Sequence, residues 1–184
     1  MSTIYNDLYS HLEPKRYDPS TPMDPNRLEA GLAFEQFMED ALKKRLTRES
    51  GRPEEMEYFI KGISTPILFN PDLIIYNGVT RCGEMKLTWL SCSEMPTEVS
   101  TGVPPKFDKY MTQIMSYCHM LETPYARLIA YFVNGGYEFQ KYKQFPNFGA
   151  PKPQLLAWDL QFTSRELHEN WMTMINWAKH RRML

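Results

Sequence analysis

The feature that most constrains the fold of this chain is a hairpin signal at Asn77-Gly78. Asn-Gly is a strong short-range indication of a turn between antiparallel strands, because both residues tolerate positive φ. The flanking segments, PDLIIY (71–76) and VTRCGEMKLTW (79–89), are rich in apolar and β-branched residues typical of strands. We therefore expect an antiparallel hairpin in the middle of the chain, around which the other elements must pack.

Helical and strand-like segments alternate on both sides of this hairpin. Helices are predicted from Asp24-Pro25 to about residue 47, from about 106 to 121, and after the capping-box sequence Thr163-Ser164-Arg165-Glu166. Further strands are predicted at 56–63, 126–133, 137–143 and 155–162. This order predicts an α/β or α+β domain, with a mixed central β-sheet flanked by helices.

The N-terminal segment differs from the rest of the chain in its closely spaced prolines. Pro14, Pro19, Pro22 and Pro25 are spaced too closely for a helix beyond the opening few residues. We therefore predict an N-terminal arm over residues 1–24 and a single domain over residues 25–184.

Composition excludes several classes of protein. The 184 residues contain no run approaching the ~20 apolar residues of a membrane helix, and the N-terminus lacks the apolar run of a signal peptide. A cytoplasmic protein is the resulting expectation. The three cysteines are too few and too scattered for a disulfide framework or a zinc site. A net charge of −1 argues against bulk coating of nucleic acid, although it leaves room for a local basic groove.

Two acidic residues and a lysine on the hairpin suggest a metal site. Asp72 opens the first strand, and Glu84 and Lys86 lie on the second. Hard cations such as Mg²⁺ take oxygen ligands, commonly one or two carboxylates plus waters and substrate phosphate. Lys86 shares the face of Glu84 because side chains alternate along a strand, so it could orient or deprotonate an attacking water.

The length of the turn decides whether this site can form. With a two-residue loop, Tyr76 would pair with Val79, and Asp72 and Glu84 would point to opposite faces of the sheet. With a three-residue loop, in which Gly78 is left-handed, Ile75 would pair with Val79, and Asp72 would share a face with Glu84 and Lys86. We predict the second register or an equivalent bulge.

The spacing PD-x11-E-x-K on a hairpin resembles the PD-(D/E)XK nuclease superfamily, whose fold is the restriction-endonuclease-like core. Gly31-Leu32-Ala33-Phe34-Glu35 lies in the preceding helix, where this superfamily often carries an acid. Gln113-Ile114-Met115-Ser116-Tyr117 is similar to the Q-x-x-x-Y motif of RecB-type nuclease domains. The resemblance spans about Gly31 to Tyr117.

The resemblance implies a role for each matching residue. A Mg²⁺ or Mn²⁺ ion would be bound by carboxylates and one backbone carbonyl: Glu35, Asp72, Glu84 and the carbonyl of Met85. Lys86 would act on the nucleophilic water. Gln113 and Tyr117 would contact the nucleic-acid strand or orient Lys86. A basic and aromatic seam on the same helix would bind phosphates and bases: Lys106, Lys109 and Tyr110.

The sequence departs from the RecB-type pattern in two respects. Glu35 stands where those domains usually have a histidine, and a carboxylate can serve as ligand in its place. Many relatives hold an iron–sulfur cluster with four cysteines, which Cys82, Cys92 and Cys118 cannot supply, so no cluster is expected.

The function implied by the resemblance is a metal-dependent deoxyribonuclease. It would be an exonuclease acting on DNA ends or single strands, in recombination, repair or phage DNA metabolism. DNA is the expected partner, a helicase, single-strand-binding or recombination protein is a candidate partner, and no membrane is involved. The expected location is the cytoplasm of a bacterial or phage-infected cell. Two alternatives stay open: a non-cutting module that binds nucleic acid or protein, and a dimeric structure- or sequence-specific endonuclease.

Overall fold

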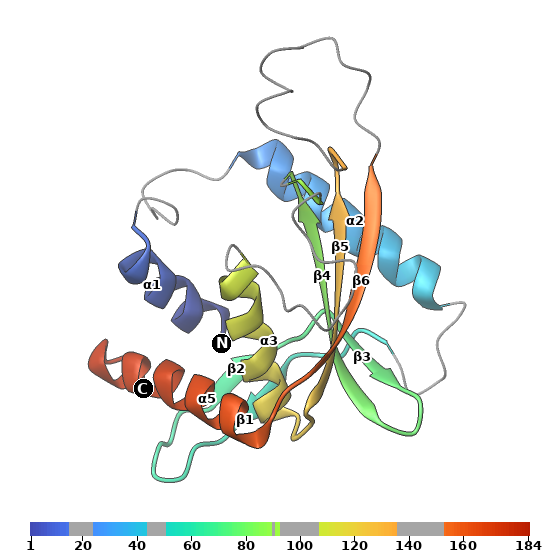
Figure 1. The fold of residues 1–184 in the computed structure, drawn as a ribbon. Helices are drawn as coiled ribbons and strands as arrows, with labels where there is room; N and C mark the ends of the chain where they lie inside the picture. The colour runs from blue at the N-terminus through green and yellow to red at the C-terminus, as the bar shows by residue number, and fades with distance from the viewer. Residues whose placement is uncertain (15–23, 44–50, 90, 93–106, 136–152) are drawn as a thin grey trace.

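A four-stranded mixed sheet forms the centre of the molecule (Figure 1). The structure, a computed structural model, describes residues 1–14, 24–43, 51–89, 91–92, 107–135 and 153–184. The strand order is β3 (Leu73–Tyr76), β4 (Thr80–Thr88), β5 (Tyr125–Phe132) and β6 (Gln154–Gln161). The β4–β5 pair is parallel, whereas β3–β4 and β5–β6 are antiparallel. The expected α/β class with a mixed central sheet flanked by helices is therefore confirmed.

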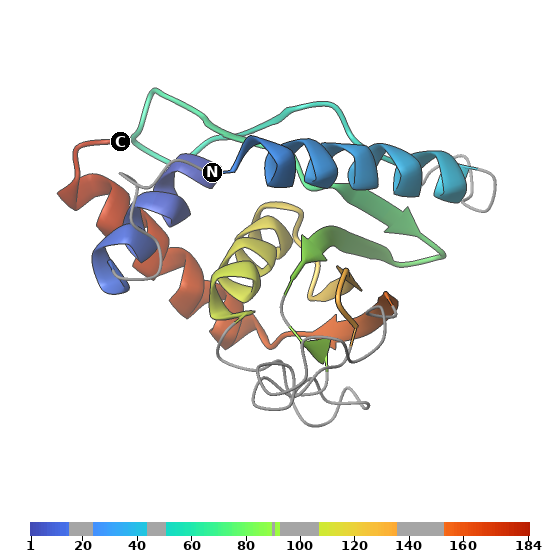
Figure 2. The same ribbon diagram turned by 90° about the horizontal axis from the view of Figure 1, so that it is seen from above.

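Helices lie on both faces of this sheet. One face is covered by α3 (Asp108–Met120) and α5 (Ser164–His180), with α1 (Ser2–Leu12) packed against both helices. Figure 2 shows these three helices together, with α2 (Pro25–Lys43) running separately along the sheet. Alternate residues of β4 divide between the two faces: Cys82 belongs to the core beneath α3 and α5, whereas Met85 packs against Met38 of α2.

The central hairpin forms in a register that differs from both considered above. Tyr76 pairs with Thr80, so the loop is Asn77-Gly78-Val79, a three-residue loop displaced by one position from the predicted one. Gly78 is left-handed as expected, with φ of 86°. The parity of the second register is preserved, and Asp72 therefore shares a face with Glu84.

The hairpin also depends on a close approach between its strands. Leu73 pairs with Gly83, and a Cβ added at Gly83 would lie 2.8 Å from the Cβ of Leu73. A glycine is required at this position because any side chain would force the two strands apart.

The N-terminal residues are not wholly an arm. Ser2–Leu12 form α1, whose Ile4, Leu8 and Tyr9 are buried in the main core. The indole nitrogen of Trp177 and the guanidinium of Arg181, both near the C-terminus, donate hydrogen bonds to Asp7. The expected arm over residues 1–24 is therefore corrected: α1 packs into the domain, because its own apolar side chains are needed to cover α3 and α5. Residues 15–23 of the arm lie outside the described part of the chain.

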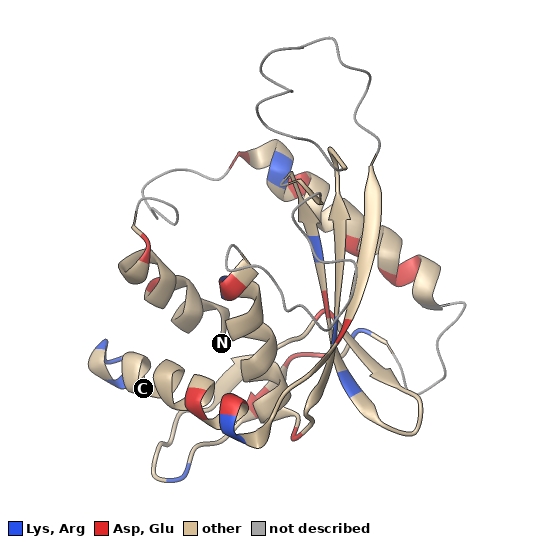
Figure 3. Ribbon diagram, viewed as in Figure 1, with Lys and Arg blue, Asp and Glu red and all other residues tan. Residues whose placement is uncertain are grey.

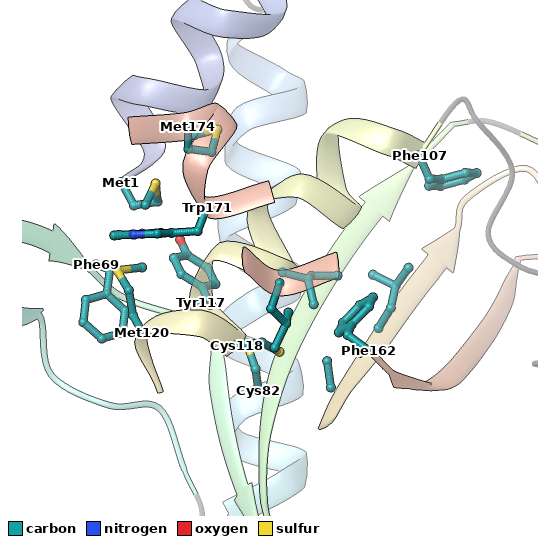
Figure 4. Close-up of a cluster of buried hydrophobic side chains, with 14 of the residues drawn as sticks. Met1, Phe69, Cys82, Phe107, Tyr117, Cys118, Met120, Phe162, Trp171 and Met174 are labelled. Atoms are coloured by element: carbon teal, nitrogen blue, oxygen red, sulfur yellow. The ribbon is translucent and has the colours of Figure 1, made fainter. Parts of the chain in front are cut away.

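The remaining elements follow the predictions with small shifts. The capping box of α5 is present, since Thr163 and Glu166 exchange backbone and side-chain hydrogen bonds. The apolar face of this helix is buried: Leu167, Trp171, Met174, Ile175 and Ala178. Figure 4 shows Trp171 and Met174 in the core near Tyr117 of α3.

The strand predicted at 56–63 is shorter than expected. In the structure this strand is β1 (Met56–Tyr58). A turn that contains Gly62, at φ of 85°, leads from β1 to β2 (Ile67–Phe69), and the two strands form a separate antiparallel sheet. The strand predicted at 137–143 lies outside the described residues. None of the described helices is both long enough and apolar enough to cross a membrane.

The large apolar side chains of α2 are only partly buried. Met38 is buried, and Phe34 and Leu42 are partly covered. Leu28, Leu32 and Phe37 are instead 52%, 58% and 68% exposed. These three side chains stay outside the core because α2 crosses the sheet with only one side against β4 and β5.

Candidate active site

The candidate site lies where β3 begins and β4 continues past it. The last ladder pair is Leu73–Gly83, so Asp72 stands opposite Glu84 at the next position. The carboxylate of Asp72 accepts a 2.7 Å hydrogen bond from the backbone N–H of Met85, which fixes it against the edge of β4. The hairpin thus brings the two acids together, as the parity of the register requires.

Glu84 is the most enclosed charged residue of the site. Its side chain is 0% exposed, one oxygen (Oε1) accepts from Lys86 Nζ, and the other (Oε2) has no hydrogen-bond partner among the described residues. Burial raises the pKa of Glu84 to about 7, against the opposing effect of Lys86 and with a further contribution from Asp72. Burial of a carboxylate oxygen without a hydrogen-bond donor destabilises the folded state, so its presence calls for a functional explanation.

Lys86 is held between carboxylate and aromatic groups. Its ammonium donates to Glu84 and lies 5.2 Å from the ring centroid of Tyr110, on α3. Burial alone would lower the pKa of Lys86, but the carboxylates of Glu84 and Asp72 outweigh it and raise the pKa above its ordinary value. Lys86 is therefore a cation in this structure.

Glu35 approaches the site from α2. Its carboxylate lies 3.6 Å from the guanidinium of Arg52, which the backbone bridge between Gly51 and Ile74 holds beside β3. Burial and the charge of Asp72 raise the pKa of Glu35, whereas Arg52 and Lys86 oppose the rise. Glu35 also contributes to the raised pKa of Glu84, so it belongs to the same electrostatic neighbourhood.

The three acids do not form a coordination shell in this structure. Within the described segments, no group of three or more His, Cys, Asp and Glu side chains lies close enough to hold a metal ion. Each acid instead has an internal partner: Glu35 forms an ion pair with Arg52, Asp72 accepts from the N–H of Met85, and Glu84 accepts from Lys86. These partners offset the repulsion that three neighbouring carboxylates would otherwise suffer.

The donor chemistry nevertheless fits a hard divalent cation. Asp72, Glu84 and Glu35 supply carboxylate oxygens, the ligand type that Mg²⁺ and Mn²⁺ prefer. The unpartnered Oε2 of Glu84 is available to such an ion. The ligand roles of these residues and of the Met85 carbonyl stay predictions.

Gln113 and Tyr117 lie below the site and not on its surface. Gln113 is 6% exposed and Tyr117 is 3% exposed, and the amide nitrogen of Gln113 donates to the Tyr117 hydroxyl at 3.0 Å. Burial, with the charge of Glu84, raises the pKa of Tyr117. Figure 4 shows Tyr117 pointing into the core beside Phe69 and Trp171, and little of Gln113 or Tyr117 is left for a strand to contact. Of the two roles considered above, this burial favours positioning.

The basic and aromatic seam is partly present. Tyr110 lies under the Lys86 ammonium, and the Lys109 ammonium lies 5.5 Å from the ring centroid of Tyr5. Burial lowers the pKa of Lys109, and the nearby charge of Lys86 adds to this effect. Lys106, the third member, lies outside the described residues.

Two residues of the site were missed by sequence reasoning. Tyr5 of α1 has a pKa raised to about 12, first by burial, while Lys86 lowers it and Glu84 and Asp72 raise it. Tyr5 therefore lies within electrostatic range of the catalytic candidates. The only sequence signal for it was an aromatic residue in an apolar pattern within the presumed arm. Arg52 was missed because its partner Glu35 lies on another element.

Comparisons with known proteins give limited information. No protein-family model and no curated protein matches the chain. A solved structure titled "Crystal structure of SSO0001" aligns with a TM-score of 0.46 and 14% identity, over 94% of this chain and 68% of that chain. A likeness at this level assigns neither a family nor a function to this chain.

Proposed function

We propose that this protein is a Mg²⁺- or Mn²⁺-dependent DNA nuclease that hydrolyses phosphodiester bonds at the start of β3. The observation that carries the proposal is the fully buried Glu84, which pairs with Lys86 through one oxygen and leaves the other unpartnered beside Asp72. A residue with only a structural role at this position would be fully hydrogen-bonded or apolar, because an incompletely paired buried charge costs stability. Clusters of this kind are more common at catalytic sites.

The metal would be held by Asp72, Glu84 and the backbone carbonyl of Met85, with Glu35 completing the site or serving a second ion. Such an ion, when bound, offsets charge on the scissile phosphate and lowers the pKa of a bound water. The chain's own contribution is to hold these oxygens on a hairpin whose register is set by the Leu73–Gly83 contact. By resemblance, the products would carry a 5′-phosphate and a 3′-hydroxyl.

Lys86 would act on the attacking water through its ammonium group. Glu84 keeps the ammonium at the site, and the ring of Tyr110 lies against it. Because the neighbouring carboxylates hold the proton on Lys86, its role in this state is to orient the water and to stabilise negative charge at the phosphate. Tyr5 and Lys109 both lie within electrostatic range of this ammonium.

We propose exonuclease action on DNA ends or single strands, on the strength of the RecB-type motif. Linear end-labelled and closed circular DNA, incubated with Mg²⁺, Mn²⁺ or EDTA, distinguish the alternatives. The exonuclease degrades only linear DNA, and loses activity in EDTA and in Lys86→Ala. The matched control is Lys61→Ala, at an exposed lysine in the turn between β1 and β2.

Other outcomes of this assay would select a different function. Cutting of the closed circles would favour a structure- or sequence-specific endonuclease. Binding of DNA without metal-dependent cutting would favour the non-cutting module and would contradict the proposal.

A further inference from the structure

A pocket adjoins the candidate site on the other side of β4. It has a volume of about 190 Å³ and lies between the N-terminal half of α2 and the end of β4. Its walls combine apolar residues, among them Leu28, Leu32, Phe34 and Leu87, with the charged residues Arg27, Glu35 and Lys86. We call it the α2–β4 pocket. Figure 2 shows how α2 runs along the sheet above these strands.

The rim of the α2–β4 pocket exposes apolar surface that the fold leaves uncovered. Leu28 and Leu32 are each more than half exposed, at 52% and 58%, although both are large aliphatic side chains. The buried contacts of α2 lie further along the helix, at Met38 and its neighbours. Exposed apolar side chains grouped beside a pocket are typical of ligand-binding surfaces.

The pocket shares two lining residues with the candidate active site. Glu35 and Lys86 line it, and both belong to the electrostatic cluster formed with Asp72 and Glu84. A DNA strand with a phosphate beside Lys86 would therefore bring an adjoining nucleotide to the mouth of the pocket.

The charge at the mouth suits a nucleotide. Arg27 lines the pocket, and its guanidinium lies 5.1 Å from the ring centroid of Trp89. Arg27 lies in the first turn of α2 and pairs with Asp24 at 3.9 Å, and acidic residues follow along the helix (Figure 3). A cation beside an aromatic ring is a favourable combination for the phosphates and bases of a single strand.

The size of the pocket limits its occupant. It is smaller than the ~300–1,000 Å³ that drug-sized ligands occupy. A single flat ring system with apolar faces suits such a space. We infer that the α2–β4 pocket binds one nucleobase of the strand whose phosphodiester lies at Glu84 and Lys86. This inference rests on the proposed function, and it adds that the enzyme grips an unpaired base next to the bond it cuts. The apolar walls make this grip tolerant of sequence.

Gly31 provides a specific way to block the pocket. It lines the pocket, and a Cβ built on it meets no atom within 4 Å. The Cβ of a substituted residue there would therefore enter open space. Because glycine in a helix interior is less stable than alanine by about 1 kcal/mol, substitution is also compatible with α2. Gly31→Leu fills the pocket, Gly31→Ala adds one methyl group, and Ala33→Leu is the control at an exposed position of the same helix.

The inference is tested by binding, independently of cleavage. Fluorescence anisotropy measures the affinity of labelled single-stranded DNA in Ca²⁺, using an intact oligonucleotide and a series in which one abasic site is moved along the strand. We expect one abasic position to weaken binding to the wild-type protein about tenfold, in line with the ~1–3 kcal/mol of a stacked base. Gly31→Leu should bind the intact strand about tenfold more weakly and should be insensitive to the abasic site. Gly31→Ala should be intermediate, and Ala33→Leu should match the wild type.

Opposite results would overturn the inference. It fails if no abasic position affects wild-type binding, if DNA does not bind, or if Gly31→Leu binds like the wild type while urea unfolding shows it to be folded. The cleavage assay separates this failure from that of the proposed function. If the protein cuts DNA but no abasic position weakens binding, only the pocket inference is rejected. If an abasic position weakens binding but no metal-dependent cutting occurs, the pocket inference is supported and the proposed nuclease function is rejected.

Discussion

Lys86 donates a hydrogen bond to Glu84, two residues earlier on the same strand, and thereby places a cation beside a carboxylate that has no exposed surface. The pairing is incomplete, because the second oxygen of Glu84 has no partner among the described residues. The pair is consequently costly for folding in the absence of a further cation. This combination of burial and incomplete compensation distinguishes the site from the exposed ion pairs, such as Arg165–Glu169 on α5.

Stability should depend on pH through Glu84. Burial raises its pKa from 4.5 in the unfolded chain to about 7 in the folded protein, so the folded state binds more protons between these values. Stability from this group is therefore highest below about pH 4.5 and falls as the pH rises to about 7, by roughly 1.4 kcal/mol per pH unit at most. Urea unfolding in EDTA at pH 5, 6, 7 and 8 should show a smaller decline in Glu84→Gln than in the wild type. Equal slopes would contradict the assigned shift.

The Glu84–Lys86 pair should behave as one unit. Lys86→Met leaves Glu84 buried without its cation, so we expect a loss of about 2 kcal/mol in the free energy of unfolding at pH 8. The double variant Glu84→Gln/Lys86→Met should recover part of this loss, because no buried charge remains. Urea unfolding of the two single variants and the double variant gives the coupling energy. Additive effects would show that the two side chains do not interact as the structure indicates.

Mg²⁺ should stabilise the protein against urea through Asp72 and Glu84. A cation that binds only the folded state raises the free energy of unfolding, by about 2.7 kcal/mol at one hundred times its dissociation constant. The stabilisation should be lost in Asp72→Asn, whereas Asp159→Asn, at an exposed residue paired with Arg127, should retain it. A Mg²⁺ effect that survives Asp72→Asn would place the ion elsewhere.

Tyr5 should affect activity through its ring. Tyr5→Phe keeps the ring beside the Lys109 ammonium and should leave cleavage within about twofold of the wild type. Tyr5→Ala removes the ring and should lower activity about tenfold, with the larger part in KM if the ring contacts the strand. Tyr9→Phe is the matched control on α1, since Tyr9 hydrogen-bonds to Thr112. If Tyr5→Ala cleaves like the wild type, α1 has only a structural role.

Two glycines should respond oppositely to alanine. At Gly83 the new Cβ would lie 2.8 Å from the Cβ of Leu73, so Gly83→Ala should destabilise the protein by about 1–3 kcal/mol and displace Asp72 from Glu84. At Gly31 the new Cβ meets nothing within 4 Å, and Gly31→Ala should stabilise α2 by about 1 kcal/mol. Thermal unfolding of both variants checks the prediction, which fails if Gly83→Ala is as stable as the wild type.

Local signals were sufficient for most elements and for the acids of the hairpin. Caps and periodicity located α2, α3 and α5, because these signals lie within a few residues of each other. The alternation of side chains along β4 placed Glu84 and Lys86 on one face before the register was known. The register itself was displaced, since Asn77-Gly78 specifies a turn but not which residue on either side opens the ladder.

Contacts between distant segments were beyond such reasoning. Tyr5 and Glu84 are far apart in the sequence, and only the packing of α1 on α3 and α5 brings them together. The apolar side chains of α2 show the same limit, since Leu32 and Met38 look alike in the sequence but the first is exposed and the second is buried. Which side of an amphipathic helix is covered depends on the angle at which it crosses the sheet.

The sequence by itself determined most of the elements, the class of fold, and the chemistry available on the hairpin at Asp72, Glu84 and Lys86. These properties depend on local backbone preference and on the two-residue period of a strand. The tertiary structure alone decided that Glu84 is fully buried with one oxygen unpaired, that Gln113 and Tyr117 face inward, and that α1 joins the core. Burial is the reason for this division, because the exposure of a side chain depends on which distant segments pack around it.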